Sequence, residues 1–135
     1  MESLIDRLDH LVLTVADSDR TVRFYSDILG MQVEIFGDNR LALRFGDQKI
    51  NIHTSGKEIK PHATTPLPGS ADLCFISSVP IAKIIDHLQE QGVAIELGPV
   101  PRTGSLGPLV SVYIRDPDGN LVEIANQTGL HAKER

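Results

Sequence analysis

Hydrophobic and polar positions in the first part of the chain predict a strand followed by a helix. Residues 8–15 alternate in the manner of a half-buried strand. The Asp17-Ser18-Asp19 segment then offers side-chain oxygens that can cap a helix over residues 20–29. Apolar residues recur there at helical spacing, and Gly30 is typical of the residue that ends a helix. Three more strands are predicted, at residues 32–36, 40–45 and 49–53.

A second unit of the same kind follows a segment broken by proline. Residues 54–70 contain Pro61, Pro66 and Pro68, which exclude a regular helix there. A strand is predicted over 72–77, and a helix begins near Pro80. The remaining strands are predicted at residues 94–97, 110–115 and 121–126, with a long loop at 98–108 and a polar tail at 128–135.

The two units repeat one another at a constant offset. His10 and Asp72 in the first strands are 62 positions apart, and so are the helix-ending residues Gly30 and Gly92. The last strands are offset by 72, because ten additional residues fall in the predicted loop. Each unit therefore reads βαβββ, and we predict one domain built from a duplicated module. Its parts are module 1 at about 6–55, a linker at about 56–69, and module 2 at about 70–127.

Composition narrows the classes of function. Hydrophobic residues make up 41% of the chain and charged residues 23%, as in globular proteins. The net charge of −5 gives no electrostatic basis for binding nucleic acid or an anionic membrane. No apolar stretch reaches the roughly 20 residues of a membrane span. The single cysteine and the lack of a signal-peptide pattern predict a cytoplasmic location.

Several segments together resemble the vicinal oxygen chelate superfamily, which includes glyoxalase I, fosfomycin- and bleomycin-resistance proteins and extradiol dioxygenases. They are the strand with His10, the helix end FYSDILGM at 24–31, and the closing segment RDPDGNLVEI at 115–124. Residues 45–53 and 98–104 look most like the subgroup called glyoxalase domain-containing protein 5. The resemblance implies an α+β fold, in which paired βαβββ modules form a cupped mixed sheet with helices outside, and a homodimer.

The resemblance also implies a divalent metal ion, held by one residue from the first and last strand of each module. The matching positions are His10, Asn51, Asp72 and Glu123. Better-known relatives carry histidine where this chain has Asp72, and aspartate shifts the preference weakly away from Zn²⁺ and Fe²⁺. The identity of the metal stays open among Ni²⁺, Mn²⁺, Zn²⁺ and Fe²⁺.

His53 competes with Asn51 for the fourth ligand position, because both side chains lie on the same strand face. The offset favours Asn51, whereas imidazole binds first-row metals better than an amide. We predict His10, Asp72, Glu123 and His53 as metal ligands, with Glu123 and His53 as catalytic residues. If His53 does not bind metal, it is a candidate general base.

The presence of each of these residues can also be explained without a functional role. His10 could be a core histidine, Glu123 an outward strand residue, and Asp72 a solvated turn residue. Substrate contacts are predicted for Arg102 in the long loop, for Asn51 and for Tyr113.

The function that the resemblance implies is a metal-dependent lyase or isomerase. Its substrate would be a small oxygenated metabolite, chelated through two neighbouring oxygens while a proton is transferred. One alternative is an Fe²⁺ extradiol-type ring-cleaving dioxygenase, to which Asp72 in place of histidine is a counter-indication. Another is a binding protein without catalysis that sequesters a drug or metabolite.

Overall fold

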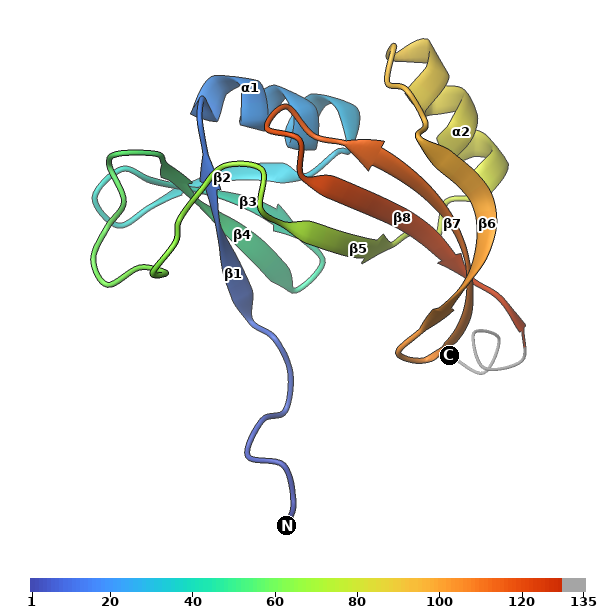
Figure 1. Ribbon diagram of the computed structural model, residues 1–135, viewed down its shortest axis with the longest axis horizontal. Coiled ribbons are helices and arrows are strands. Elements are labelled where there is room, and N and C mark those ends of the chain that lie inside the picture. Colours follow the sequence, from blue (N-terminus) through green and yellow to red (C-terminus); the bar gives the residue numbers. More distant parts are fainter. Residues whose placement is uncertain (130–135) are drawn as a thin grey trace. The chain divides into compact units, whose positions relative to one another are not determined.

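The computed structural model describes residues 1–129, so most of the predicted tail at 128–135 lies outside the described residues. The chain divides into two compact units, Met1–Pro68 and Gly69–Arg135. The division falls within the predicted linker at 56–69. Each unit contains one four-stranded mixed sheet (Figure 1). The helices among residues 1–129 are all too short or too polar to cross a membrane.

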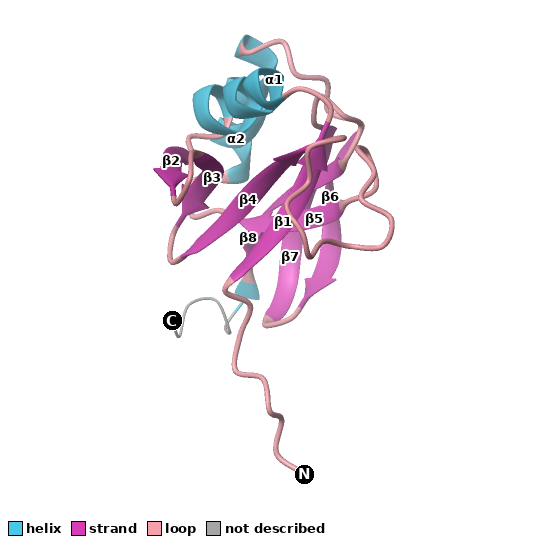
Figure 2. Ribbon diagram, turned by 90° about the vertical axis from the view of Figure 1, so that its left-hand side faces the viewer, coloured by secondary structure: helices cyan, strands magenta, loops and turns pink. Residues whose placement is uncertain are grey.

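Unit 1 contains four strands and one helical segment of two types. Its elements are β1 (His10–Val15), α1 (Ser18–Val22), η1 (Arg23–Ile28), β2 (Gln32–Phe36), β3 (Arg40–Phe45) and β4 (Gln48–Thr54). The strand order is β1-β4-β3-β2, with β1 parallel to β4 and the other neighbours antiparallel (Figure 2).

The helical segment begins at the predicted cap. The Asp17 carboxylate accepts the backbone N–H groups of Asp19 at 2.9 Å and Arg20 at 3.3 Å, which would otherwise lack partners. The single helix expected at 20–29 is α-helical only over α1 and becomes a π-helix in η1. This wider turn accompanies the burial of two consecutive aromatic residues, Phe24 and Tyr25, whose rings pack edge to face at 4.9 Å.

Unit 2 repeats the architecture of unit 1. Its elements are β5 (Asp72–Ile76), α2 (Ile81–Glu90), β6 (Leu97–Gly104), β7 (Gly107–Arg115) and β8 (Leu121–Gln127). The strand order is β5-β8-β7-β6, again with the first and last strands parallel. The predicted α+β fold of paired βαβββ modules is therefore confirmed.

The predicted loop at 98–108 is wrong, because these residues form a hairpin that extends β6 and β7. The strand expected at 94–97 begins only at Leu97 and runs on to Gly104. Pro99 and Pro101 suggested a loop, but β6 is the edge strand of its sheet. A proline is tolerated on an edge, because its missing N–H can fall on the side without a neighbouring strand.

The closing turn of unit 2 explains the RDPDGN sequence in structural terms. The Asp116 carboxylate accepts the N–H groups of Asp118 and Asn120 at 2.9 Å. The buried Asn120 amide donates to Asp116 at 2.8 Å and accepts the Ala71 N–H at 2.8 Å. Arg115 pairs with Glu96 at 2.9 and 3.1 Å. This turn therefore ties the start of β5 to β8.

The close approach of β6 to β7 requires glycine at position 98, and this requirement can be tested by substitution. Gly98 has φ +116°, and a Cβ there would lie 2.5 Å from the Ser111 carbonyl oxygen. We expect Gly98→Ala to lower the free energy of unfolding by about 3 kcal/mol or more, measured by denaturant titration.

Gly92→Ala is the matched control. Gly92 also has positive φ, but a Cβ there meets nothing within 4 Å, so the cost should be only about 1–2 kcal/mol. Equal losses for the two variants would contradict the close approach of β6 to β7.

Candidate functional site

The parallel pairing of first and last strands determines which side chains share a face. In unit 1, His10 lies opposite Lys49, so Asn51 is two residues further along the neighbouring strand. In unit 2, Asp72 lies opposite Leu121, and Glu123 is again two residues further along. The offsets of 62 and 72 in the sequence are thus offsets between equivalent positions in the two sheets.

We call the faces that carry these residues the polar faces. In unit 1 the polar face holds His10 and Asn51, and in unit 2 it holds Asp72 and Glu123. Within residues 1–129, no three His, Cys, Asp or Glu side chains gather closely enough to hold a metal ion. The structure therefore presents the predicted donors as two equivalent pairs, one in each unit.

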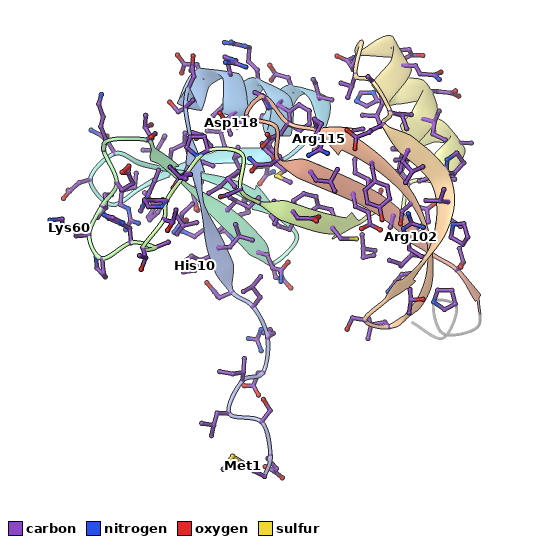
Figure 3. All side chains as sticks on the ribbon, viewed as in Figure 1. Met1, His10, Lys60, Arg102, Arg115 and Asp118 are labelled. Carbon is purple, nitrogen blue, oxygen red and sulfur yellow. The ribbon has the colours of Figure 1, made fainter. Side chains whose placement is uncertain are left out.

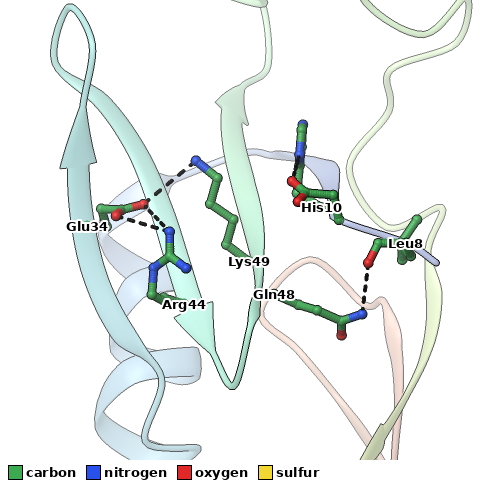
Figure 4. A network of polar contacts seen from close by, with 7 residues as sticks. Leu8, His10, Glu34, Arg44, Gln48 and Lys49 are labelled. Atoms are coloured by element: carbon green, nitrogen blue, oxygen red, sulfur yellow. Dashed lines mark hydrogen bonds and ion pairs between the residues drawn. The ribbon is translucent and has the colours of Figure 1, made fainter. Parts of the chain in front are cut away.

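His10 is exposed, so it is not a core histidine. Its Nδ1 lies 2.8 Å from the Asp9 carboxylate, a contact that the dashed line at His10 marks in Figure 4. An imidazole that donates Nδ1–H to a carboxylate keeps a lone pair on Nε2. The Asp9 pKa is lowered chiefly by this hydrogen bond.

Asn51 and His53 are buried on the polar face of unit 1, with 4% and 6% of their surfaces exposed. Asn51 Oδ1 and both ring nitrogens of His53 have no hydrogen-bond partner. Leaving such groups unpaired costs about 1–3 kcal/mol each, so they are candidates to contact a bound group. In register, Asn51 is the counterpart of Glu123, whereas His53 is the counterpart of Ala125.

Burial lowers the pKa of His53, and the positive charge of Arg40 lowers it further. A lowered pKa keeps the imidazole neutral at physiological pH, the form in which one nitrogen accepts a proton or binds a metal.

Glu123 is held by a neighbouring strand of unit 2. Ser111 on β7 donates its hydroxyl to Glu123 Oε2 at 2.6 Å, and the Glu123 side chain is half-buried. Glu123 is therefore held by a hydrogen bond while it keeps part of its surface exposed. Cys74 lies opposite Glu123 on β5, and desolvation, then the Glu123 and Asp72 charges, raise the thiol pKa to about 11. Cys74 keeps some exposed surface, although its sulfur is partly desolvated.

Arg102 and Tyr113 form a contact next to Glu123. Tyr113 lies opposite Glu123 in the sheet, and its hydroxyl oxygen accepts a hydrogen bond from Arg102 Nε at 2.8 Å. The guanidinium also lies 5.3 Å from the Tyr113 ring centroid. Arg102 belongs to β6 and not to a loop, so its side chain is positioned by the sheet (Figure 3).

A second polar network lies on unit 1 (Figure 4). Glu34 accepts hydrogen bonds from Arg44 at 3.2 and 3.3 Å and lies 3.7 Å from Lys49. The Lys49 ammonium also lies 3.7 Å from the Phe36 ring centroid. Glu34 thereby compensates much of the positive charge on this part of the polar face.

Sequence reasoning missed Ser111 and Arg40. Ser111 is two residues from Tyr113 in the same strand, so its shared face could have been inferred. Arg40 follows from the predicted strands at 40–45 and 49–53, because their antiparallel register, with Leu41 opposite Ile52, brings Arg40 next to His53.

The comparisons with known proteins agree on one family. The family model described as "Glyoxalase/Bleomycin resistance protein/Dioxygenase superfamily" matches residues 7–124. The resemblance to the superfamily is therefore confirmed, while the narrower resemblance to glyoxalase domain-containing protein 5 stays a prediction.

Three proteins are similar along most of the chain. Virulence protein STM3117 of Salmonella typhimurium is 53% identical over 93% of this chain and 87% of its own. Its crystal structure superimposes with a TM-score of 0.91, over 93% of this chain and all of that one. Glyoxalase domain-containing protein RDO1 of Mycosarcoma maydis is 54% identical over 88% of this chain and 67% of its own. An integron cassette protein of V. cholerae is 49% identical, with a TM-score of 0.92, over 95% and 100% of the two chains.

The raised pKa of Cys74 predicts that its thiol is alkylated slowly. Only the thiolate is alkylated, and a pKa of about 11 leaves little thiolate at pH 8. We expect iodoacetamide to react with Cys74 on the order of 100-fold more slowly than with a free cysteine, and the rate to rise toward pH 11.

Glu123→Gln in metal-free protein removes the adjacent negative charge, so it should accelerate alkylation at pH 8. Glu90→Gln, on the exposed end of α2, is the control and should leave the rate unchanged. A wild-type rate equal to that of free cysteine would contradict the environment of Cys74 described above.

Proposed function

Because the chain belongs to the Glyoxalase/Bleomycin resistance protein/Dioxygenase superfamily, we propose that it is a metal-dependent lyase or isomerase. Its substrate in this proposal is a small oxygenated metabolite, and its reaction includes a proton transfer. The observation that carries the proposal is the register of the two sheets, which gives each unit one donor pair at equivalent positions.

Members of this superfamily typically bind a divalent metal ion, and the donor set of this chain suits one. His10 offers Nε2 with Nδ1 engaged by Asp9, and Glu123 has one oxygen engaged by Ser111. Asp72 supplies a second carboxylate. One imidazole and two carboxylates suit Ni²⁺, Mn²⁺, Zn²⁺ or Fe²⁺.

The fourth ligand in this proposal is either Asn51 or His53. Asn51 has the equivalent register position and an amide oxygen without a partner. His53 has the better donor atom for a first-row metal. When bound, the ion would polarise two neighbouring substrate oxygens and stabilise negative charge on them.

Glu123 and His53 are the proposed proton carriers. The Ser111 hydroxyl donates to Glu123 Oε2 and orients the carboxylate, whose other oxygen is the proposed proton acceptor. His53 is neutral and has two unpaired nitrogens, so one of them accepts a proton while the other donates a hydrogen bond. Arg102 and Tyr113 are the proposed substrate contacts beside Glu123.

The assembly and location belong to the same proposal. Members of the superfamily are usually dimers that bind small molecules, and we propose a homodimer. A cytoplasmic location is proposed from the single cysteine of the chain.

The test is metal affinity in matched carboxylate variants. We expect Glu123→Gln to weaken Mn²⁺ or Ni²⁺ binding by more than about 10-fold, measured by titration of the purified protein, since one donor loses its charge. Ser111→Ala should weaken binding by about 10-fold, because Ser111 orients that carboxylate.

Glu90→Gln is the control, because Glu90 lies on the exposed end of α2 and should not affect the metal. Unchanged affinity in Glu123→Gln would remove Glu123 from the ligand set. A wild-type protein that binds no divalent metal would leave sequestration as the function, and bound iron with ring cleavage would indicate the dioxygenase.

A further inference from the structure

The geometry points to a pocket in unit 1 that binds a small monocarboxylate through Arg40, Lys57 and His53. The pocket is a cavity of about 240 Å³ at the ends of β3 and β4, lined by these three residues among others. It lies wholly within unit 1. That this carboxylic acid is also the substrate of the enzyme rests on the proposed function, whereas its binding in the pocket does not.

The buried histidine is the first reason to expect a ligand. His53 is 6% exposed, lines the cavity, and has no hydrogen-bond partner at either ring nitrogen. A buried imidazole left unpaired on both sides is unfavourable, and a bound oxygen would satisfy it. His53 therefore supplies one hydrogen bond to an occupant of the cavity.

The placement of Arg40 favours an anion in the cavity. The Arg40 guanidinium lies 4.8 Å from the Phe36 ring centroid, so its position is held by stacking. Within residues 1–129, Arg40 forms no ion pair with a carboxylate of its own chain. A stacked guanidinium keeps its N–H edge for a carboxylate, which it binds in a bidentate manner.

The balance of charge disfavours a multiply charged ligand. Arg40 and Lys57 contribute two positive charges to the lining, and Asp38 contributes one negative charge. The Glu58 carboxylate, which accepts the Gly56 N–H at 2.6 Å, adds a second negative charge close enough to act on His53. The charges of these side chains then nearly cancel, so a monoanion bound by Arg40 is repelled less than a phosphate dianion.

The size and walls of the cavity indicate a short ligand. A volume of about 240 Å³ lies below the range of about 300–1,000 Å³ that is typical of pockets for drug-sized ligands. Leu41, Ile52 and Ile59 contribute apolar walls that suit a short carbon skeleton. The ligand class is thus a short monocarboxylic acid with one further oxygen, such as a hydroxy or keto group, that pairs with His53.

The experiment is calorimetric titration of the purified protein with pyruvate, lactate, methyl pyruvate and inorganic phosphate. We expect pyruvate or lactate to bind, and the neutral methyl ester and phosphate to bind at least about 10-fold more weakly. Arg40→Gln should weaken acid binding by about 10-fold or more, and Lys57→Gln and His53→Gln should each weaken it by several-fold. Lys60→Gln, an exposed lysine of the same segment, is the control and should have no effect (Figure 3).

A second measurement needs no variant. Amide chemical shifts of labelled protein should change with added pyruvate at Asn39, Thr54 and Lys57, which line or border the cavity. Changes confined to unit 2, no binding by either acid, or equal binding by Arg40→Gln would each overturn the proposal, as would tighter binding of phosphate.

Titration in the presence of a metal chelator separates this inference from the proposed function. Binding that persists in chelator and depends on Arg40 supports the pocket, even if the metal-dependent reaction proves wrong. Acid binding that disappears with the metal and is insensitive to Arg40→Gln places the acid at the metal and overturns the pocket.

Discussion

The site depends on the parallel pairing of the first and last strands in each unit. Because strand side chains alternate between faces, a slip of one residue would move every donor to the opposite face. The alternate positions in the same strands are buried apolar residues, such as Leu13 opposite Ile52 in unit 1. Burial of these apolar residues stabilises the strand register. The same register positions the polar residues, so the hydrophobic core and the candidate site both depend on it.

The polar faces also concentrate groups that a folded protein normally avoids. Asn51 and His53 have buried atoms without partners, and desolvation, followed by the nearby Glu123 charge, raises the thiol pKa of Cys74. Each of these features is unfavourable in the chain by itself. Their occurrence at equivalent strands of both units is the physical reason to regard these faces as functional.

The positions and register of the strands could be predicted wherever the local alternation of polar and apolar residues determines them. Residues 32–36 and 40–45 form the strands that alternation predicted, and the offsets of 62 and 72 reappear as equivalent positions in the sheets. The hairpin at 98–108 did not follow, because proline tolerance depends on whether a strand lies at an edge. The π-helical η1 also did not follow, since its cause is the packing of Phe24 and Tyr25.

The candidate site could be predicted only in part, because contacts between its side chains depend on tertiary geometry. Residue type and spacing indicated His10, Asp72 and Glu123, but the partners Asp9 and Ser111 are set by side-chain geometry. The β3–β4 hairpin connects Arg40 with His53, but no local pattern brings Lys57 and Ile59 of the following segment to the same cavity.

The central proposal is that the donors at these equivalent positions bind a divalent ion. Crystals grown with Mn²⁺ and measured near its absorption edge test this claim directly. The account predicts an anomalous peak within about 2.0–2.4 Å of His10 Nε2 and of carboxylate oxygens of Asp72 and Glu123. A peak that contacts donors of only one pair, or a metal-saturated crystal with no peak at these residues, would contradict it.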